Sequence, residues 1–339
     1  MAIAAMLATA SRNTEGLTIF FGGIALDSDF AFEQLEDQND RTSRMQLTLR
    51  RGVLSSLEEQ AAREDVVHRA RGRYSLTLSK VRRESTSGLG ERWIFRSCFP
   101  DVFLFDPASH RIDCHIASAD DRVWQDVLLR RVIPRIATTY GALAIHAAAV
   151  AIENRCFLLL GQSGAGKSTL TAFCAQAGWR ALSEDTTLIW PDDGTDFTVE
   201  PVQRGIGVWN ATREALALAP VDCTLMPGYG GDKYWFDPPT DAGVDPQPLS
   251  GVLVLERSAD VAAPVLTRMP RSEALRTLLG QAIAFLPSER PDAASATLFG
   301  RIATLSASVP CFRLVYPDGY AQLPQTERLM RIMPIVEAA

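Results

Sequence analysis

The sequence has no CxxC pair among its six cysteines and no apolar run of the roughly 18 to 20 residues that crosses a bilayer. The cysteines are scattered through the chain, and several lie in apolar runs, where a thiol packs like a small hydrophobe. We therefore expect free thiols, a reducing cytoplasm as the location, and no association with a membrane.

Positive charge is also scarce. The 339 residues carry a formal net charge of −6, with 34 Lys and Arg against 40 Asp and Glu. A general electrostatic footprint for nucleic acid or for anionic lipid is therefore missing. The apolar opening MAIAAMLATA lacks the basic stretch of a secretory signal, so none is expected. The composition, 47% hydrophobic and 22% charged, is typical of a globular chain with one large or two moderate domains.

The first third of the chain is predicted to be rich in strands. Six segments are enriched in β-branched or aromatic residues and alternate in part, namely 17–21, 45–50, 73–79, 92–99, 102–105 and 111–116. The Glu and Ala content of 55–70 favours a short helix between the second and third of these segments.

The pattern changes after Ser118, where a helix is predicted to run to about Tyr140 with a kink at Pro134. We therefore divide the chain into a smaller strand-rich N-terminal domain, 1–117, and an α/β domain, 118–339. In the α/β domain strands alternate with helices. Its other predicted features are a Pro- and Gly-rich loop at 227–248, a helix at about 271–286 and a final strand pair near 311–316.

A phosphate-binding motif follows the predicted strand 156–160. Residues Gly161 to Ser168 read G-x-x-x-x-G-K-S and precede a helical pattern that ends at Gly178. The glycines let backbone N–H groups point at phosphate, Lys167 reaches the outer phosphates, and the Ser168 hydroxyl is suited to Mg²⁺. The alternative is a chance glycine-rich turn before a helix. The predicted nucleotide contacts are Gly161, Ser163, Gly164, Ala165, Gly166, Lys167, Ser168 and Thr169.

An acidic pair follows the next predicted strand. That strand, Arg180 to Ser183, is expected to run parallel to the first, so Glu184 and Asp185 lie beside the bound phosphates. A carboxylate there can hold Mg²⁺ or accept the proton of an attacking hydroxyl. The alternative is an exposed acidic turn at a strand end.

A hairpin is predicted just before the glycine-rich loop, with Glu153 and Asn154 as its turn. Pairing across this turn puts His146 opposite Gly161. A histidine there can bind phosphate or assist proton movement, whereas a core histidine bonded to the backbone fits the sequence equally well.

Together these residues resemble the catalytic core of the bacterial HPr kinase/phosphorylase family. His146 stands 21 residues before Lys167 and Asp185 stands 18 after it, and RGIGVWN at 204–210 is similar to an RGLG-type segment of the family. The resemblance is close over 146–209. It implies a P-loop nucleotide-binding core of the kind shared by HPr kinase and phosphoenolpyruvate carboxykinase, and a serine kinase that uses ATP and Mg²⁺. Asp185 would then accept the proton of the serine, Lys167 would neutralise the transferred group, Ser168 would help hold Mg²⁺, and His146 would contact phosphate.

Several positions depart from the family pattern. Val202 stands where the family has its metal-binding glutamate, and Glu200, on the same face of a strand, is the candidate substitute. Glu184 replaces the first acid of an Asp-Asp pair and is a further metal candidate. No counterpart of the basic segment associated with phosphorylase activity is present, so that activity is not expected.

The stretches IHAAAVAI, GQSGAGKSTL and GWRALSED resemble stand-alone HPr-kinase-like proteins, some of which accompany lasso-peptide biosynthesis, more than they resemble the carbon-catabolite enzyme. This resemblance implies as partner a peptide or small protein bearing an acceptor serine, and the strand-rich domain is a candidate for binding it along a sheet edge. A homo-oligomer stays open.

Arg204 and Lys233 are candidate phosphate contacts. The alternatives are an arginine that covers apolar surface with its stem and a solvated lysine in a mobile, lid-like loop. The competing function is a P-loop ATPase or a nucleotide-binding switch without phosphotransfer. An LSGGQ-like signature and an NKxD motif are both missing, which disfavours ABC ATPases and GTPases.

Overall fold

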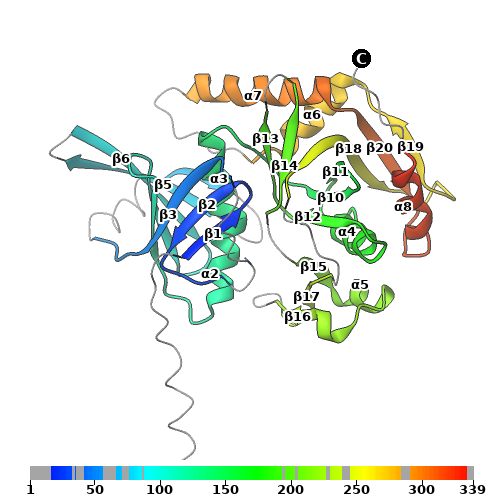
Figure 1. The fold of residues 1–339 in the computed structure, drawn as a ribbon, viewed down its shortest axis with the longest axis horizontal. Helices are drawn as coiled ribbons and strands as arrows, with labels where there is room; N and C mark the ends of the chain where they lie inside the picture. Colours follow the sequence, from blue (N-terminus) through cyan, green and yellow to red (C-terminus); the bar gives the residue numbers. More distant parts are fainter. Residues whose placement is uncertain are drawn as a thin grey trace, which may run out of the picture. The chain divides into compact units, whose positions relative to one another are not determined.

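A computed structural model gives the fold, drawn as a ribbon in Figure 1. The residues that it describes are 17–32, 35, 42–55, 66–70, 76–85, 88–192, 195–202, 205–226, 230–238, 245–283 and 291–333. They form two compact units, and the chain passes from the first to the second between Ala119 and Asp120. The short segment Phe21–Gly23 groups with the second unit. The boundary expected from the sequence lies two residues earlier.

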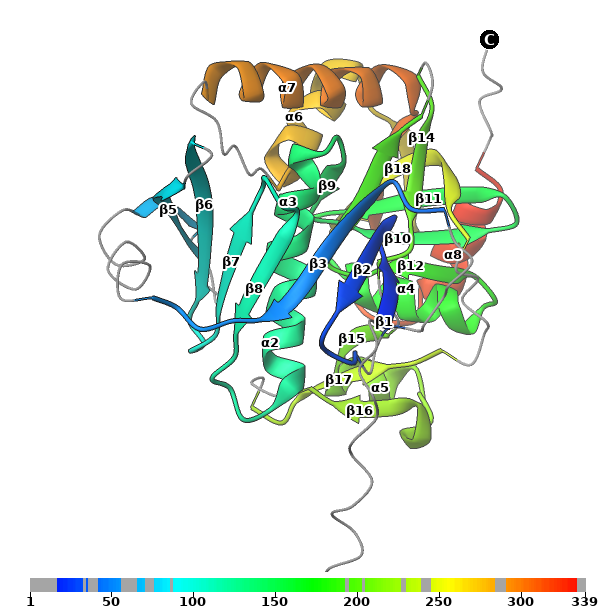
Figure 2. The same ribbon diagram turned by 60° about the vertical axis from the view of Figure 1, so that its left-hand side comes forward.

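The first unit is built on one eight-stranded sheet with the order β1-β2-β3-β8-β7-β6-β5-β4 (Figure 2). Its strands are β1 (Leu17–Phe21), β2 (Ile24–Ser28), β3 (Met45–Arg51), β4 (Val66–Ala70), β5 (Leu76–Ser85), β6 (Gly88–Ser97), β7 (Val102–Asp106) and β8 (Arg111–His115). Alternate residues of β3, Met45, Leu47 and Leu49, are buried, as expected for a strand with one covered face. The strands β1 and β4 form the two edges of the sheet.

The predicted strands of this unit are found, and two local predictions fail. The helix expected over 55–70 is wrong at its C-terminal end, because Val66–Ala70 forms β4 and pairs antiparallel with β5; residues 56–65 lie outside the described part. The strand β2, which pairs with β3, was not predicted. Pairing with a neighbouring strand outweighs local helix propensity at 66–70.

The second unit is an α/β structure around a nine-stranded sheet. Seven strands follow the order β12-β10-β11-β18-β14-β13-β9, while β20 pairs with β18 and β19 pairs with β20. The strands are β9 (Leu143–Ile145), β10 (Ala148–Ile152), β11 (Arg155–Leu160), β12 (Arg180–Ser183), β13 (Thr187–Pro191), β14 (Phe197–Glu200), β18 (Gln247–Arg257), β19 (Val265–Arg268) and β20 (Cys311–Tyr316). The neighbours β11, β18 and β20 run parallel, so their carboxyl ends lie at one edge.

The hairpin predicted before the glycine-rich loop is confirmed in its register. Ala148 pairs with Leu159 and Ile152 pairs with Arg155, which leaves Glu153 and Asn154 as the turn. The same register, continued two residues beyond β10, brings His146 level with Gly161. A two-residue turn fixes the register of every residue pair that follows it, so the sequence is sufficient to predict the register of this hairpin.

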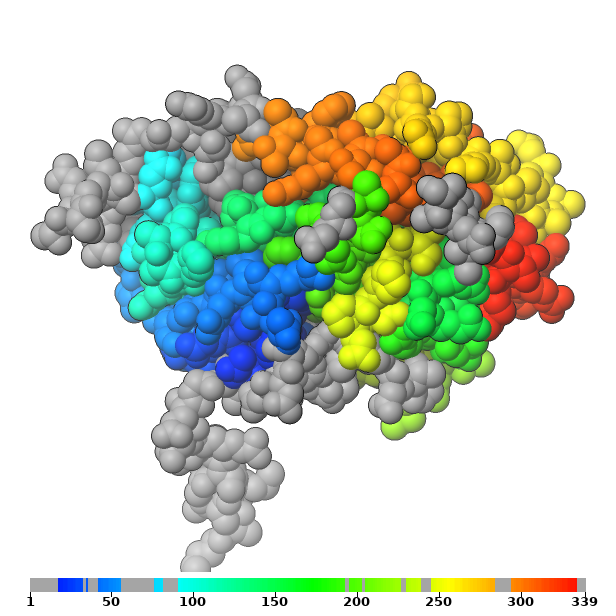
Figure 3. Space-filling model, turned by 45° about the horizontal axis from the view of Figure 1, so that its top comes forward, coloured from blue at the N-terminus to red at the C-terminus, as the bar shows by residue number. Residues whose placement is uncertain are grey.

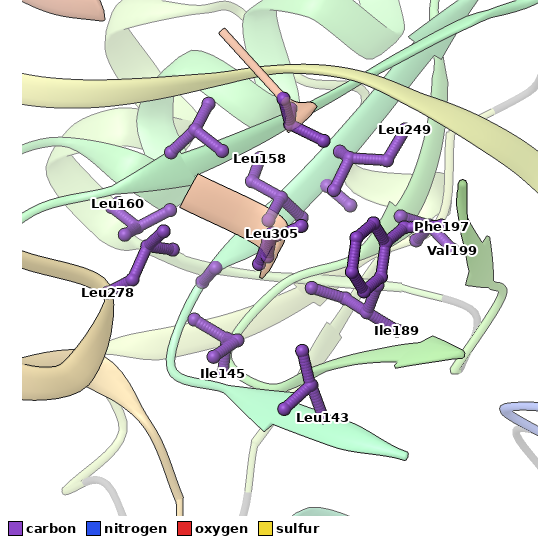
Figure 4. Close-up of a cluster of buried hydrophobic side chains, with 14 of the residues drawn as sticks. Leu143, Ile145, Leu158, Leu160, Ile189, Phe197, Val199, Leu249, Leu278 and Leu305 are labelled. Atoms are coloured by element: carbon purple, nitrogen blue, oxygen red, sulfur yellow. The ribbon is translucent and has the colours of Figure 1, made fainter. Parts of the chain in front are cut away.

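The central strand β11 divides its side chains between two cores. Cys156, Leu158 and Leu160 point to the face covered by α6 (Arg271–Gln281) and α7 (Pro291–Ser308), a cluster shown in Figure 4. Phe157 and Leu159 point to the opposite face, covered by α4 (Lys167–Gln176) and α8 (Leu323–Arg331). All five side chains are at most 2% exposed. Because both faces of β11 are tightly packed, the strand has a fixed position, and so does the start of the loop that follows it.

Two of these helices, α7 and α8, were not predicted, whereas α6 lies inside the segment expected to be helical. The outer side of α7 belongs to the surface in Figure 3, where it is drawn in orange. None of the helices in the described part of the chain is long and apolar enough to cross a membrane. All six cysteines are described and are free thiols.

The helix that opens the second unit has three parts, α2 (Asp121–Val127), the π-helical turn η1 (Leu128–Val132) and α3 (Ile133–Thr139). In the π-helical turn the N–H of Ile133 bonds the carbonyl of Leu128, five residues back. Pro134 has no N–H to donate to the carbonyl of Arg130, which accepts instead from the Thr186 hydroxyl at 3.4 Å. The irregularity expected at Pro134 is thus a widened turn before it, of the kind often found at functional sites.

Candidate active site

The glycine-rich loop lies between β11 and α4, at the carboxyl ends of the parallel strands. Gly166 precedes α4 with φ 95°, a left-handed conformation that glycine adopts without strain. A Cβ at this position would lie 2.5 Å from the Tyr316 hydroxyl oxygen and 2.9 Å from a nitrogen of Arg257. A Cβ at Gly164 (φ 83°) would have no neighbouring atom within 4 Å, so the loop is open there. The backbone of the loop is therefore accessible at this edge of the sheet.

Lys167 begins α4 and turns back over the loop. Its Nζ donates to the carbonyl oxygen of Gly161 at 2.7 Å, and its side chain is buried. Burial lowers the pKa of Lys167, while the charges of Asp185 and Glu184 oppose the shift. Both carboxylates, which follow β12, therefore lie close enough to the amine to favour its charged form.

Ser168 connects the loop to the acidic pair. Its Oγ donates to Oε1 of Glu184 at 2.5 Å, and the other carboxylate oxygen of Glu184 lies 3.0 Å from Nη1 of Arg130. Glu184 and Arg130 are each about 5% exposed. A buried carboxylate of this kind is held in one position by partners on both oxygens.

Arg130 was not recognised in the sequence, although it contacts three acidic residues. Besides Glu184, its Nε lies 2.8 Å from Oδ1 of Asp126, and its Nη1 lies 3.8 Å from Oδ2 of Asp185. Its guanidinium carbon lies 4.5 Å from the ring centre of Trp235, a cation–π distance. Arg130 lies in the π-helical turn η1. The only local signal is Pro134 four residues later, which marks an irregular helix but does not indicate what the arginine contacts.

Asp185 and His146 lie in the two connections that join the β9–β13 pair of the sheet to the β10–β12 pair. Residues 146–147 connect β9 to β10, and 184–186 connect β12 to β13, while Ile145 pairs with Thr187 and Ala149 pairs with Ser183. Because strands pair on both sides of these connections, the two segments must lie side by side. The Thr187 hydroxyl accordingly donates to the carbonyl of Ala147 at 3.0 Å.

The His146 ring bonds the same connection. Its Nδ1 lies 2.8 Å from the carbonyl oxygen of Asp185 and 3.4 Å from Oδ1 of the Asp185 side chain. Since a carbonyl only accepts, Nδ1 carries the proton and Nε2 is directed elsewhere. The side chains of His146 and Asp185 are 39% and 24% exposed, so both are accessible to a substrate.

Lys233 is placed differently from the prediction. It does not lie within a loop but begins β17 (Lys233–Phe236), which pairs with β15 (Ile206–Trp209) and β16 (Cys223–Leu225) in a small sheet. Gly207 makes room for it, because a Cβ there would lie 3.0 Å from Nζ of Lys233 and 3.4 Å from Oε2 of Glu184. Its charge lowers the pKa of Asp185. Lys233 is thus beside the acidic pair, while Tyr229 of the predicted loop lies outside the described residues.

Two other predicted residues are not brought into this group by the described contacts. Glu200 is buried at the end of β14 opposite Leu188, and its Cγ is 3.0 Å from the position of a Cβ on Gly23. Arg204 lies outside the described residues. Of the remaining loop residues, Ser163 is exposed, and the Thr169 hydroxyl lies 3.1 Å from that of Thr212.

The donors present suit Mg²⁺. Among the described residues, no cluster of three or more His, Cys, Asp or Glu side chains is arranged to hold a metal. Mg²⁺ in nucleotide sites commonly takes one or two protein oxygens and fills the other positions with water and phosphate. The contacting oxygens of Ser168 and Glu184 fit that pattern.

Comparisons with known proteins found one matching family model and similar solved structures. A family model described as the SynChlorMet cassette protein ScmC matches residues 113–204, which include His146, the glycine-rich loop and the acidic pair. A search of curated proteins found no match. The structure of the HPr(Ser) kinase/phosphatase from Coxiella burnetii is similar at 14% identity and a TM-score of 0.30, over 56% of this chain and 93% of that one.

The buried pair of Arg130 and Glu184 leads to a prediction for stability. Arg130→Met leaves the buried carboxylate of Glu184 without its cation, and Glu184→Gln leaves Arg130 undercompensated, so each should lower the free energy of unfolding by about 3 kcal/mol. The loss of unfolding free energy in the double variant should be smaller than the sum of the two single losses, by about 1 kcal/mol or more, because the double variant removes both charges. Urea unfolding measures all three.

Arg122→Met provides the matched control. Arg122 is 38% exposed and pairs with Asp120 in the same helical region, so its loss should cost less than about 1 kcal/mol. Additive losses in the double variant would contradict a direct contact between Arg130 and Glu184.

Asp185 leads to a prediction for pH. Burial alone would raise the pKa of Asp185, but the charges of Arg130, His146, Arg131 and Lys233 together hold it below its ordinary value. The unfolded chain then binds this proton more readily than the folded one, so stability falls as the pH drops below about 4. In Asp185→Asn that acid-induced loss should be smaller. Unfolding midpoints at pH 5 and pH 3 test this, with Asp196→Asn, which removes an exposed carboxylate, as control. An equal shift of the midpoint between the two pH values in both variants would refute it.

Proposed function

We propose that this protein is an ATP-dependent kinase that transfers the γ-phosphoryl group to a serine hydroxyl of a peptide or small protein. The observation that carries the proposal is the convergence of Lys167, Ser168 and Asp185 at one edge of the sheet, with Asp185 held as an accessible carboxylate. Phosphoryl transfer needs mainly the alignment of hydroxyl, metal and phosphate. An arrangement with a cation, a hydroxyl suited to Mg²⁺ and an accessible carboxylate suits this reaction.

The donor side of this site is a P-loop core of the type shared by HPr kinase and phosphoenolpyruvate carboxykinase. Backbone N–H groups between Gly161 and Thr169 bind the phosphates together with the start of α4. Lys167 exchanges its hydrogen bond with the Gly161 carbonyl for contact with the outer phosphates, whose charge it neutralises. Because the amine is already partly desolvated, this move costs little further desolvation. Ser168 and Glu184 would hold Mg²⁺, which would act as a Lewis acid that stabilises negative charge on the phosphate oxygens.

The acceptor side is formed by Asp185. Its carboxylate accepts the proton of the serine hydroxyl as the new oxygen–phosphorus bond forms and the bond from the γ-phosphorus to the bridging oxygen of ADP breaks. A carboxylate with a low pKa is a weak base, so the proton moves late, when the hydroxyl oxygen has already begun to bond phosphorus. His146 holds the backbone of Asp185 through Nδ1 and orients the carboxylate. Lys233 adds positive charge beside the transferred group.

The family resemblance extends the proposal to the substrate. We propose a peptide acceptor of the lasso-peptide precursor type, bound along an edge strand of the first unit, in a cytoplasmic protein whose six thiols are free. An extended peptide that adds to a sheet edge gains backbone hydrogen bonds there.

A labelling assay tests the reaction. With γ-labelled ATP, Mg²⁺ and a serine peptide encoded beside this protein, label is expected on the peptide. In Asp185→Asn, transfer should fall by a factor of about 100 or more because the proton acceptor is lost, while ATP binding stays within about threefold of wild type. Labelled free phosphate alone would indicate an ATPase, and binding without turnover would indicate a switch.

Glu153→Gln is the charge-matched control. Glu153 lies in the exposed turn between β10 and β11, at the end of β11 away from the loop, so transfer should be unchanged. Transfer by Asp185→Asn at the wild-type rate would show that Asp185 is not the proton acceptor.

Photo-crosslinking tests the peptide site. A serine peptide with a photoreactive residue should label the edge strands β1 or β4 of the first unit, and a scrambled peptide should label them less. Crosslinks confined to the second unit would contradict a role of the first unit in peptide binding.

A further inference from the structure

A cluster at the carboxyl ends of β18 and β20 has no role in the site described so far. Leu160, the last residue of β11, pairs with Val254, but β18 continues for three more residues to Arg257. Arg257 pairs with Tyr316, the last residue of β20. At about 3.3 Å per residue, β18 therefore extends about 10 Å beyond the end of β11, alongside the glycine-rich loop.

Tyr316 supports the loop from this side. Its side chain is 2% exposed, and its hydroxyl donates to the carbonyl of Ala165. Arg257 lies beside the Tyr316 hydroxyl at Gly166, because a Cβ on Gly166 would meet both the hydroxyl oxygen and the Arg257 guanidinium. The Arg257 side chain is 39% exposed, and its ion-pair partner Asp318, at 3.9 Å, is 71% exposed. A guanidinium has five N–H donors, so Arg257 retains donors for a ligand at the loop.

Tyr320 lies on the same side, in the segment between β20 and α8. Its aromatic side chain is 36% exposed. The Tyr320 hydroxyl lies 3.4 Å from the hydroxyl of Thr212, which lies 3.1 Å from that of Thr169. Through Thr212 the ring is therefore fixed beside the first turn of α4.

The strand order sets the direction of the donor across the loop. Asp185 follows β12, and β10 and β11 separate β12 from β18. A donor whose γ-phosphoryl group faces Asp185 must therefore extend its inner phosphates and nucleoside away from β12, over the ends of β18 and β20. That is where Arg257 and Tyr320 lie.

We infer that Arg257 and Tyr320 form the subsite for the nucleoside half of the phosphoryl donor. The inference rests on the proposed kinase function and extends it. The guanidinium of Arg257 contacts the inner phosphates, and the ring of Tyr320 stacks on the base. Stacking on a single aromatic ring accepts any base, so purine nucleotides should bind with similar affinity unless further groups select among them.

Calorimetric titration of the full chain with ATP and with inorganic tripolyphosphate, both with Mg²⁺, tests the subsite. Tyr320→Leu should weaken ATP binding about tenfold and leave tripolyphosphate within about twofold, because only ATP has a base to stack. Tyr320→Phe, which keeps the ring, should bind ATP like wild type. Arg257→Met should weaken both ligands about tenfold, because both have phosphates.

Arg268→Met is the matched control for charge. Arg268 is an exposed arginine that ends the edge strand β19, and its loss should change neither affinity. The subsite is refuted if Tyr320→Leu binds ATP like wild type, or if it loses tripolyphosphate and ATP equally. If the wild-type chain binds neither ligand, the proposed phosphate site itself is wrong, so the two failures are distinguishable.

Discussion

The site depends on one topological constraint. Two connections run side by side from one strand pair of the sheet to another. These connections, residues 146–147 and 184–186, are held together because β9 pairs with β13 on one side and β10 pairs with β12 on the other. His146 and Asp185 are brought together by backbone pairing and need no attraction between their side chains. The hairpin register then puts both beside Gly161. A one-residue slip in either pair would turn these side chains to the other face.

Charge then fixes the side chains within that frame. Three carboxylates, Asp126, Glu184 and Asp185, surround Arg130, and Lys167 and Lys233 act on the same group. Arg130, Lys167 and Glu184 are buried, and burying charges is costly unless they are paired or hydrogen-bonded, as these three are. The arrangement is poorly explained as a source of stability alone. It is well suited to binding a triphosphate, because dipoles and charges that are already oriented need not reorganise during the reaction.

Local chemistry decided which features the sequence could predict. The glycine-rich loop, the hairpin turn and the strand before Glu184 each depend on a few adjacent residues, and the structure has all three where they were expected. Arg130 could not be found, because its contacts arise from a π-helical turn and from residues more than fifty positions away. The glycines before Lys233 indicate a loop, but pairing with Trp209 makes Lys233 part of a strand. Pairing with the next strand along the chain, β5, likewise makes Val66–Ala70 a strand against its helical composition.

A crystal structure of the protein with Mg²⁺ and a non-hydrolysable ATP analogue would locate the phosphates relative to Lys167 and Asp185. We expect the γ-phosphate to lie between Nζ of Lys167 and the carboxylate of Asp185, with an acceptor hydroxyl able to approach from the side of Asp185. A nucleotide bound away from the glycine-rich loop, or an Asp185 carboxylate turned from the γ-phosphate toward the interior, would contradict it.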